Sequence, residues 1–124
     1  MARRGRIRTG SELFGKAFEN WVFHELCAYN SYREVFAQFA YWRLSSGTEV
    51  DFIVNHLDCA IEAKAVRSVD DRHLKGLREL AVDHPEVKKR VIVSLDEKDR
   101  LTGDGIEVFH YTTFLQRLWG GALF

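Results

Sequence analysis

The chain has 124 residues with 46% hydrophobic and 29% charged residues, which is the size and composition of one globular domain. The two cysteines exclude a disulfide framework and a Cys-rich zinc module. No 18-residue apolar run is present, so we expect no membrane span. No apolar signal-peptide core follows the first arginines, which favours a cytoplasmic location.

The 18 basic and 18 acidic residues cancel, but the charge is unevenly spread along the chain. Residues 1–16 carry a local charge of +4, so the remainder carries −4. We expect residues 1–10 to form a flexible basic arm and residues 11–124 to form a single domain. A basic arm is compatible with nucleic-acid binding, although a frayed, solvated end explains it equally well. Overall neutrality argues against strong non-specific DNA binding.

The first half of the domain is predicted to be a helix followed by three strands. Apolar residues recur at helical spacing over residues 11–29, and Ser11 is a suitable N-cap. Residues 38–44 are rich in aromatic side chains and predict a strand. Residues 48–54 alternate between polar and apolar, and residues 59–64 predict a further short strand.

The second half is predicted to contain a helix, two strands and a closing helix. The middle helix starts at Asp70 and Asp71 and continues to about residue 82. Residues 91–95 form a continuous apolar run, typical of a strand covered on both faces, and residues 106–110 predict the last strand. Residues 112–119 predict the closing helix. The order α-β-β-β-α-β-β-α predicts an α/β domain with a mixed central sheet flanked by helices.

The most informative segment is the hairpin predicted from residues 48–54 and 59–64. If it is centred between His56 and Leu57, Asp51 faces Glu62 and Glu49 faces Lys64. One face then carries the charged side chains together with two small or apolar ones: Glu49, Asp51, Ile53, Ala60, Glu62 and Lys64. The other face is wholly apolar: Val50, Phe52, Val54, Cys59, Ile61 and Ala63.

The facing carboxylates of Asp51 and Glu62 suggest metal chemistry. Such a pair lies about 5 Å apart at Cβ and is costly under a covering helix unless a cation or proton intervenes. Mg²⁺, or Mn²⁺ in its place, is a suitable cation because it takes carboxylate and carbonyl oxygens. Lys64, on the same face, could act on a water or stabilise a phosphate. The alternative is a solvated charged face with an ordinary Glu49–Lys64 pair, worth at most about 1 kcal/mol.

Four sequence segments resemble the PD-(D/E)xK nuclease superfamily. They are G-K-A-F-E-N at 15–20, Y-W-R-L-S-S-G at 41–47, E-V-D-F-I-V at 49–54 and I-E-A-K at 61–64. Their order is similar to that of archaeal Holliday-junction resolvases. The closer resemblance is to the uncharacterised nuclease-like domain at the C-terminus of many bacterial and archaeal AAA-type ATPases, which also has a G-L-x-x-L segment like residues 76–80. The resemblance covers roughly residues 13–119 and implies a restriction-endonuclease-like fold.

The resemblance implies a role for each residue of the predicted site. Asp51 and Glu62 would be metal ligands, with the backbone carbonyl of Ala63 as a third. Lys64 would be the catalytic base or an electrostatic stabiliser. Glu19, on the first helix, would complete the metal site or hold its water, although its position at the edge of the apolar stripe also suits a surface residue.

Four further positions belong to the same set of predictions. The resemblance implies that Arg43 contacts phosphate, and we expect Ser45 in the following turn to do the same. Val50 stands where the superfamily has its leading proline. Glu25 lies near the centre of the apolar stripe of the first helix and is a reserve candidate. A structural salt bridge, for instance to Arg43, is an equally good explanation of Glu25.

The sequence therefore predicts metal-dependent hydrolysis of phosphodiesters, in DNA rather than RNA. The alternative is a catalytically silent module that binds nucleic acid or protein and is associated with an AAA-type ATPase. The expected partners are DNA, an AAA-type ATPase domain or protein, and a second copy of the chain, with no membrane contact.

Overall fold

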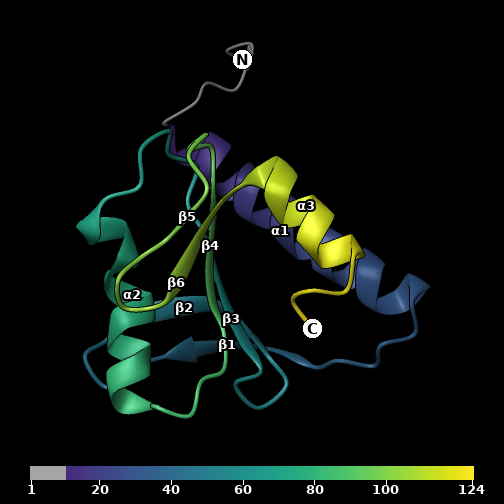
Figure 1. The fold of residues 1–124 in the computed structure, drawn as a ribbon, viewed down its shortest axis with the longest axis horizontal. Helices are drawn as coiled ribbons and strands as arrows, with labels where there is room; N and C mark the ends of the chain where they lie inside the picture. The colour runs from purple at the N-terminus through teal and green to yellow at the C-terminus, as the bar shows by residue number, and fades with distance from the viewer. Residues whose placement is uncertain (1–10) are drawn as a thin grey trace, which may run out of the picture.

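A computed structural model describes residues 11–124 as a six-stranded sheet with helices on both faces. The predicted basic arm at residues 1–10 lies outside the described residues. Figure 1 shows helices α1 and α3 side by side on one face of the sheet and helix α2 on the other. The helices are α1 (Glu12–Tyr32), α2 (Asp71–Asp83) and α3 (Tyr111–Trp119). The strands are β1 (Phe39–Arg43), β2 (Glu49–Val54), β3 (Cys59–Ala63), β4 (Arg90–Ser94), β5 (Arg100–Leu101) and β6 (Ile106–His110).

The helices begin where the sequence provides caps. The Ser11 hydroxyl accepts a hydrogen bond from the Phe14 N–H at 3.0 Å, which fixes the first turn of α1. Asp70 caps α2 and forms a reciprocal capping box with His73. Both predicted caps are confirmed. Helix α1 continues to Tyr32, three residues beyond the predicted end.

The sheet is mixed, with strand order β1-β2-β3-β4-β6-β5. Strands β3, β4 and β6 are parallel, while β1, β2 and β5 each pair antiparallel with a neighbour. The predicted register of the β2–β3 hairpin is confirmed by the pairs Phe52–Ile61, Ile53–Ala60 and Val54–Cys59. The predicted α/β class with a mixed central sheet is therefore confirmed. The two-residue edge strand β5 was not predicted.

A β-bulge interrupts the pairing of β1 with β2. Ala40 pairs with Ile53, but the next pair is Trp42 with Val50. Asp51 and Phe52 therefore stand together opposite Tyr41, the arrangement that defines a bulge. Bulges bend a strand and redirect its side chains, and they are frequent beside active sites.

The bulge corrects one prediction about the two faces of the hairpin. Simple alternation places Val50 on the same face as Phe52, whereas Val50 is buried on the α2 side with Ile53. The extra residue in β2 shifts the alternation by one position, so side chains before it change face. Phe52 and Val54 stay on the α1 side, as predicted.

Buried apolar side chains cover both faces of the sheet. The core under α1 and α3 includes Val22, Leu26, Ile61, Val93 and Phe114. The core under α2 includes Ile53, Leu77, Leu80, Ile92 and Val108. Glu62 lies on the α2 face, where a Cβ at Gly76 would be 4.0 Å from Glu62 Cδ. Within residues 11–124, no helix is both long enough and apolar enough to cross a membrane.

Candidate metal and phosphate site

The candidate site lies where the ladder between β2 and β3 ends. Backbone pairing between the two strands stops at Phe52–Ile61, and beyond it carboxylate side chains accept hydrogen bonds from the backbone of the facing strand. The Asp51 N–H donates to Glu62 Oε1 at 2.8 Å, and the Ala63 N–H donates to Asp51 Oδ2 at 2.9 Å. Each carboxylate is thus fixed to the backbone of the facing strand. The predicted pair of facing carboxylates is present, held by a defined set of hydrogen bonds.

Burial makes this carboxylate pair difficult to ionise. Glu62 is only 3% exposed, and burial raises its pKa, with the charge of Asp51 adding to the effect. Burial also raises the pKa of Asp51, and the charge of Glu19 raises it further. Within residues 11–124, the cation that pairs with Glu62 is Lys64, whose Nζ lies 3.7 Å from Glu62 Oε2. One partly exposed lysine is shared by two buried carboxyl groups, so without a further cation the protonated form of Glu62 is favoured near neutral pH.

Asp96 shows how this fold stabilises a buried carboxylate that needs no further partner. It is 6% exposed, and burial alone would raise its pKa. The N–H groups of Val69 and Lys98 donate to it, and Arg100 lies 3.1 Å away, so its pKa is lowered overall. Glu62 is similarly buried, but no arginine of the described residues 11–124 pairs with it. A raised pKa in a cleft is the feature expected of a functional carboxylate.

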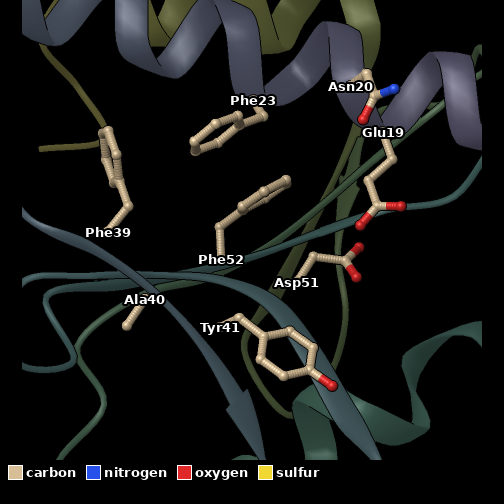
Figure 2. Close-up of a pocket in the computed structure, with 8 residues that line it drawn as sticks. All are labelled: Glu19, Asn20, Phe23, Phe39, Ala40, Tyr41, Asp51 and Phe52. Atoms are coloured by element: carbon tan, nitrogen blue, oxygen red, sulfur yellow. The ribbon is translucent and has the colours of Figure 1, made fainter.

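Glu19 reaches the site from helix α1. Its side chain is 34% exposed and lies 3.9 Å from Lys16, and Figure 2 shows its carboxylate directed toward that of Asp51. Its charge raises the pKa of both Asp51 and Glu62. Nevertheless, residues 11–124 contain no group of three or more His, Cys, Asp or Glu side chains placed to hold a metal. The structure thus brings two carboxylates together with Glu19 beside them, not three converging side-chain ligands.

A polar cleft of about 420 Å³ lies between α2 and the carboxylates. Asp51, Glu62 and Lys64 line it from the sheet, and Arg72 and Lys75 line it from α2. Both cations form ion pairs. Arg72 Nη2 lies 2.9 Å from Asp70 Oδ2, and Lys75 Nζ lies 3.9 Å from Glu79 Oε2. The exposed Lys75 pair is of the weak kind, whereas Asp70 holds the Arg72 guanidinium through two hydrogen bonds; both side chains place positive charge at the cleft.

Gly76 allows α2 to lie this close to the site. A Cβ at this position would be 3.2 Å from the Glu49 carbonyl oxygen and 4.0 Å from Glu62 Cδ. The absence of a side chain therefore sets the width of the cleft. Sequence reasoning missed Arg72, His73 and Lys75, all of which line it. The available signal was a set of basic side chains in the first turns of the helix that follows I-E-A-K.

Asp51 also lines a second cavity, of about 360 Å³, on the α1 side of the sheet. Figure 2 shows its walls, which include four aromatic side chains: Phe23, Phe39, Tyr41 and Phe52. Glu19 and Asn20 of α1 add polar groups near Asp51. Because Asp51 occupies the bulge, it borders both the polar cleft and this aromatic cavity.

The family model described as Domain of unknown function (DUF4143) matches residues 14–114. The chain belongs to this family. The matched span includes Glu19, Asp51, Glu62 and Lys64, together with the cationic residues of α2. No curated protein and no solved structure matches this DUF4143 domain.

Arg43 and Ser45 of this DUF4143 domain lie outside the lining of the polar cleft. Arg43 Nη2 lies 2.8 Å from Glu49 Oε2, its cross-strand neighbour, so Glu49 pairs with Arg43 rather than with the predicted partner Lys64. The Ser45 hydroxyl donates to Asp83 Oδ2 at 3.3 Å, near the end of α2. Arg43 is paired with Glu49, which lines the cleft, but does not line the cleft itself. Ser45 is bonded to the C-terminal end of α2 instead.

Glu25 has a structural partner elsewhere. The Trp119 indole N–H donates to Glu25 Oε1 at 3.1 Å, which ties α1 to α3. The suggested ion pair with Arg43 is therefore wrong, because the partner comes from the closing helix. Glu25 lines neither the polar cleft nor the aromatic cavity. Its position gives no support to the reserve assignment.

Proposed function

We propose that this domain hydrolyses phosphodiester bonds in DNA with a divalent cation held at Asp51 and Glu62. The observation that carries the proposal is the under-compensated carboxylate pair. Both groups have raised pKa values through burial, and within residues 11–124 the cation paired with Glu62 is one partly exposed lysine. Asp96 is also buried but is paired with Arg100 and has a lowered pKa, so a raised pKa is not a general property of buried acids in this fold.

The donor atoms suit a hard cation. Asp51 and Glu62 offer carboxylate oxygens, and the Ala63 carbonyl offers a third oxygen, which is the set that Mg²⁺ or Mn²⁺ prefers. When bound, such an ion supplies Lewis-acid activation of water and offsets charge on the phosphate. Glu19, whose carboxylate points toward Asp51, is placed to hold a water on the α1 side.

The remaining residues of the cleft suit a phosphate. Lys64 carries its charge beside Glu62, where it can stabilise the negative oxygens of the transition state. Arg72 and Lys75 stand at the α2 wall, where they can hold the neighbouring backbone phosphates. In the reaction, the attacking water loses one proton to solvent as its oxygen bonds to phosphorus, the bond to the leaving oxygen breaks, and that oxygen takes up a proton from solvent.

A second candidate is a binding module without hydrolysis. It is favoured by the absence, within residues 11–124, of a group of three ligating side chains. It is also favoured by the backbone N–H groups that already occupy one oxygen of each carboxylate. The domains that this chain resembles occur with AAA-type ATPases, which makes such an ATPase the natural partner of a silent module.

Cleavage assays test the proposal directly. A panel of supercoiled plasmid, single-stranded DNA, a four-way junction and structured RNA is incubated with Mg²⁺ or Mn²⁺. We expect wild type to cleave DNA and both Asp51→Ala and Lys64→Ala to lose the activity. Lys88→Ala is the matched control, because Lys88 is exposed and paired with Asp58 at 3.4 Å, away from the cleft.

The outcomes separate the two candidates. Cleavage retained in Asp51→Ala and Lys64→Ala contradicts the proposed site. No cleavage by wild type, together with DNA binding or ATPase binding, supports the silent module. Cleavage by wild type and by Lys88→Ala that both Asp51→Ala and Lys64→Ala lose supports hydrolysis at Asp51 and Lys64.

A further inference from the structure

We propose that the aromatic cavity beside Asp51 holds one unpaired nucleobase of the DNA strand whose phosphate enters the polar cleft. This inference rests on the proposed function and names its substrate class. The substrate is DNA with an unpaired nucleotide at the site of attack rather than a continuous duplex.

The walls of the cavity suit a flat aromatic ring. Phe23 stacks on Phe52 with centroids 5.5 Å apart and an interplanar angle of 11°, and Phe39 meets Phe23 edge-on at 6.3 Å. Tyr41, 56% exposed, is the most exposed of the four aromatic side chains that line the cavity. The volume of about 360 Å³ is at the lower end for ligand pockets, which favours a small ring. Bases bind proteins by stacking on such side chains, whatever their sequence.

The polar side of the cavity distinguishes a base from an apolar peptide side chain. Asn20 is exposed, lines the cavity and carries both a donor and an acceptor, as base edges do. The Glu19 carboxylate can accept a hydrogen bond from an exocyclic amine. A leucine or phenylalanine from a partner protein would leave both polar groups without use. A cavity with aromatic walls and one hydrogen-bonding side therefore suits a nucleobase better than an apolar side chain.

The position of Asp51 connects the cavity to the cleft. Asp51 lines both spaces, next to the point where the β2–β3 ladder ends at Phe52–Ile61. A nucleotide likewise joins a base to a phosphate through one sugar, so the two spaces suit two parts of the same nucleotide. A base inside an intact stack cannot enter such a pocket without being turned out, which costs unpairing energy. An unpaired nucleotide avoids that cost.

The charge of the chain supports the same conclusion. With zero net charge, the protein has little general attraction for the phosphate backbone. Stacking supplies affinity that does not depend on net charge. The exposed face of Tyr41 on edge strand β1 provides an open entry for the base.

Binding is measured with 2-aminopurine, a fluorescent base that is quenched when it stacks. One DNA carries a single unpaired 2-aminopurine in a duplex, and its partner DNA is fully paired at the same position. Ca²⁺ replaces Mg²⁺ so that binding is read without turnover. We expect wild type to bind the unpaired DNA more tightly and to quench it. Tyr41→Ala and Phe23→Ala should each weaken that binding about tenfold.

The control is Tyr32→Ala, because Tyr32 is 78% exposed and lies outside the cavity. Since Tyr41 is also exposed, its substitution leaves the core intact. Equal affinity for paired and unpaired DNA overturns the inference, as does equal binding by Tyr41→Ala, Phe23→Ala and Tyr32→Ala. With Mg²⁺, equal cleavage of both DNAs overturns the inference but not the proposed function. Selective binding of unpaired DNA without cleavage overturns the proposed function but supports the base site.

Discussion

Replacing Glu62 with glutamine should stabilise the metal-free protein and abolish its response to Mg²⁺. A glutamine carbonyl oxygen can still accept the hydrogen bond from the Asp51 N–H that Glu62 Oε1 accepts at 2.8 Å. What the substitution removes is a carboxyl group whose charged form burial and Asp51 both disfavour. The same charge is what a divalent cation would bind. Stability and metal binding are therefore expected to change in opposite directions.

The size of both effects follows from the burial of Glu62. Near neutral pH, removing a carboxyl group that must take up a proton on folding is worth about 1–3 kcal/mol at a site only 3% exposed. A domain of this size gains on the order of 4 °C in Tm per kcal/mol, so Glu62→Gln should melt about 4–12 °C higher without metal. Mg²⁺ at a hundred times its Kd should stabilise wild type by about 2.7 kcal/mol, or roughly 11 °C. The variant should show no such shift.

Thermal unfolding near neutral pH, first in EDTA and then across a Mg²⁺ titration, measures both quantities. Asp96→Asn is the matched control, because Asp96 is equally buried but is paired with Arg100. It should lose stability through the unpaired arginine while keeping the Mg²⁺ shift. If Glu62→Gln melts below wild type in EDTA and still responds to Mg²⁺, Glu62 is only a structural acceptor and the reasoning is refuted.

Three further predictions follow from the same structure. Because the folded pKa values of Asp51 and Glu62 are raised, the folded state holds protons more tightly than the unfolded state. Metal-free wild type should therefore lose stability as pH rises from the ordinary carboxyl range through neutrality, and urea titrations should show a smaller loss for Glu62→Gln. Gly76→Val should lower the free energy of unfolding by about 1–3 kcal/mol, measured by chemical denaturation, because the new side chain meets the Glu49 carbonyl. It should also weaken the rise in Tm caused by Mg²⁺, because it narrows the cleft. An unchanged rise in Tm would show that α2 does not set the width of the site. Glu25→Ala should cost about 1 kcal/mol through the lost Trp119 hydrogen bond and leave cleavage unchanged, whereas reduced cleavage would return Glu25 to the site.

The hairpin was predictable because period-2 alternation and a short connection constrain it strongly. The register that places Asp51 near Glu62 is confirmed by the pair Phe52–Ile61. The bulge was not predictable, because it arises from the pairing of β2 with two neighbours in different registers. No glycine marks it in the sequence. The predicted face of Val50 is therefore wrong, although the predicted register of β2 with β3 is confirmed.

The cationic wall of the cleft was missed for a different reason. Arg72 and Lys75 are separated in sequence from the carboxylates, and they reach the site only because Gly76 allows α2 to approach β2. Spacing within one element cannot reveal such a contact. The same limit applies to Glu25, whose partner Trp119 lies at the far end of the chain. The carboxylates of neighbouring strands were accessible from spacing and Glu19 from the family resemblance, whereas the cationic side chains of α2 and the partner of Glu25 were not.

The hydrogen bonds from the backbone to the carboxylates make two amides into reporters of the site. The Asp51 N–H donates to Glu62, and the Ala63 N–H donates to Asp51. A proton or ion that changes the charge on either carboxylate changes the corresponding amide hydrogen bond. Nuclear magnetic resonance of ¹⁵N-labelled protein would read these two amide shifts directly, without substrate and without any substitution. Occupancy of the site can thus be followed in the native chain, from the signals of two backbone nitrogens.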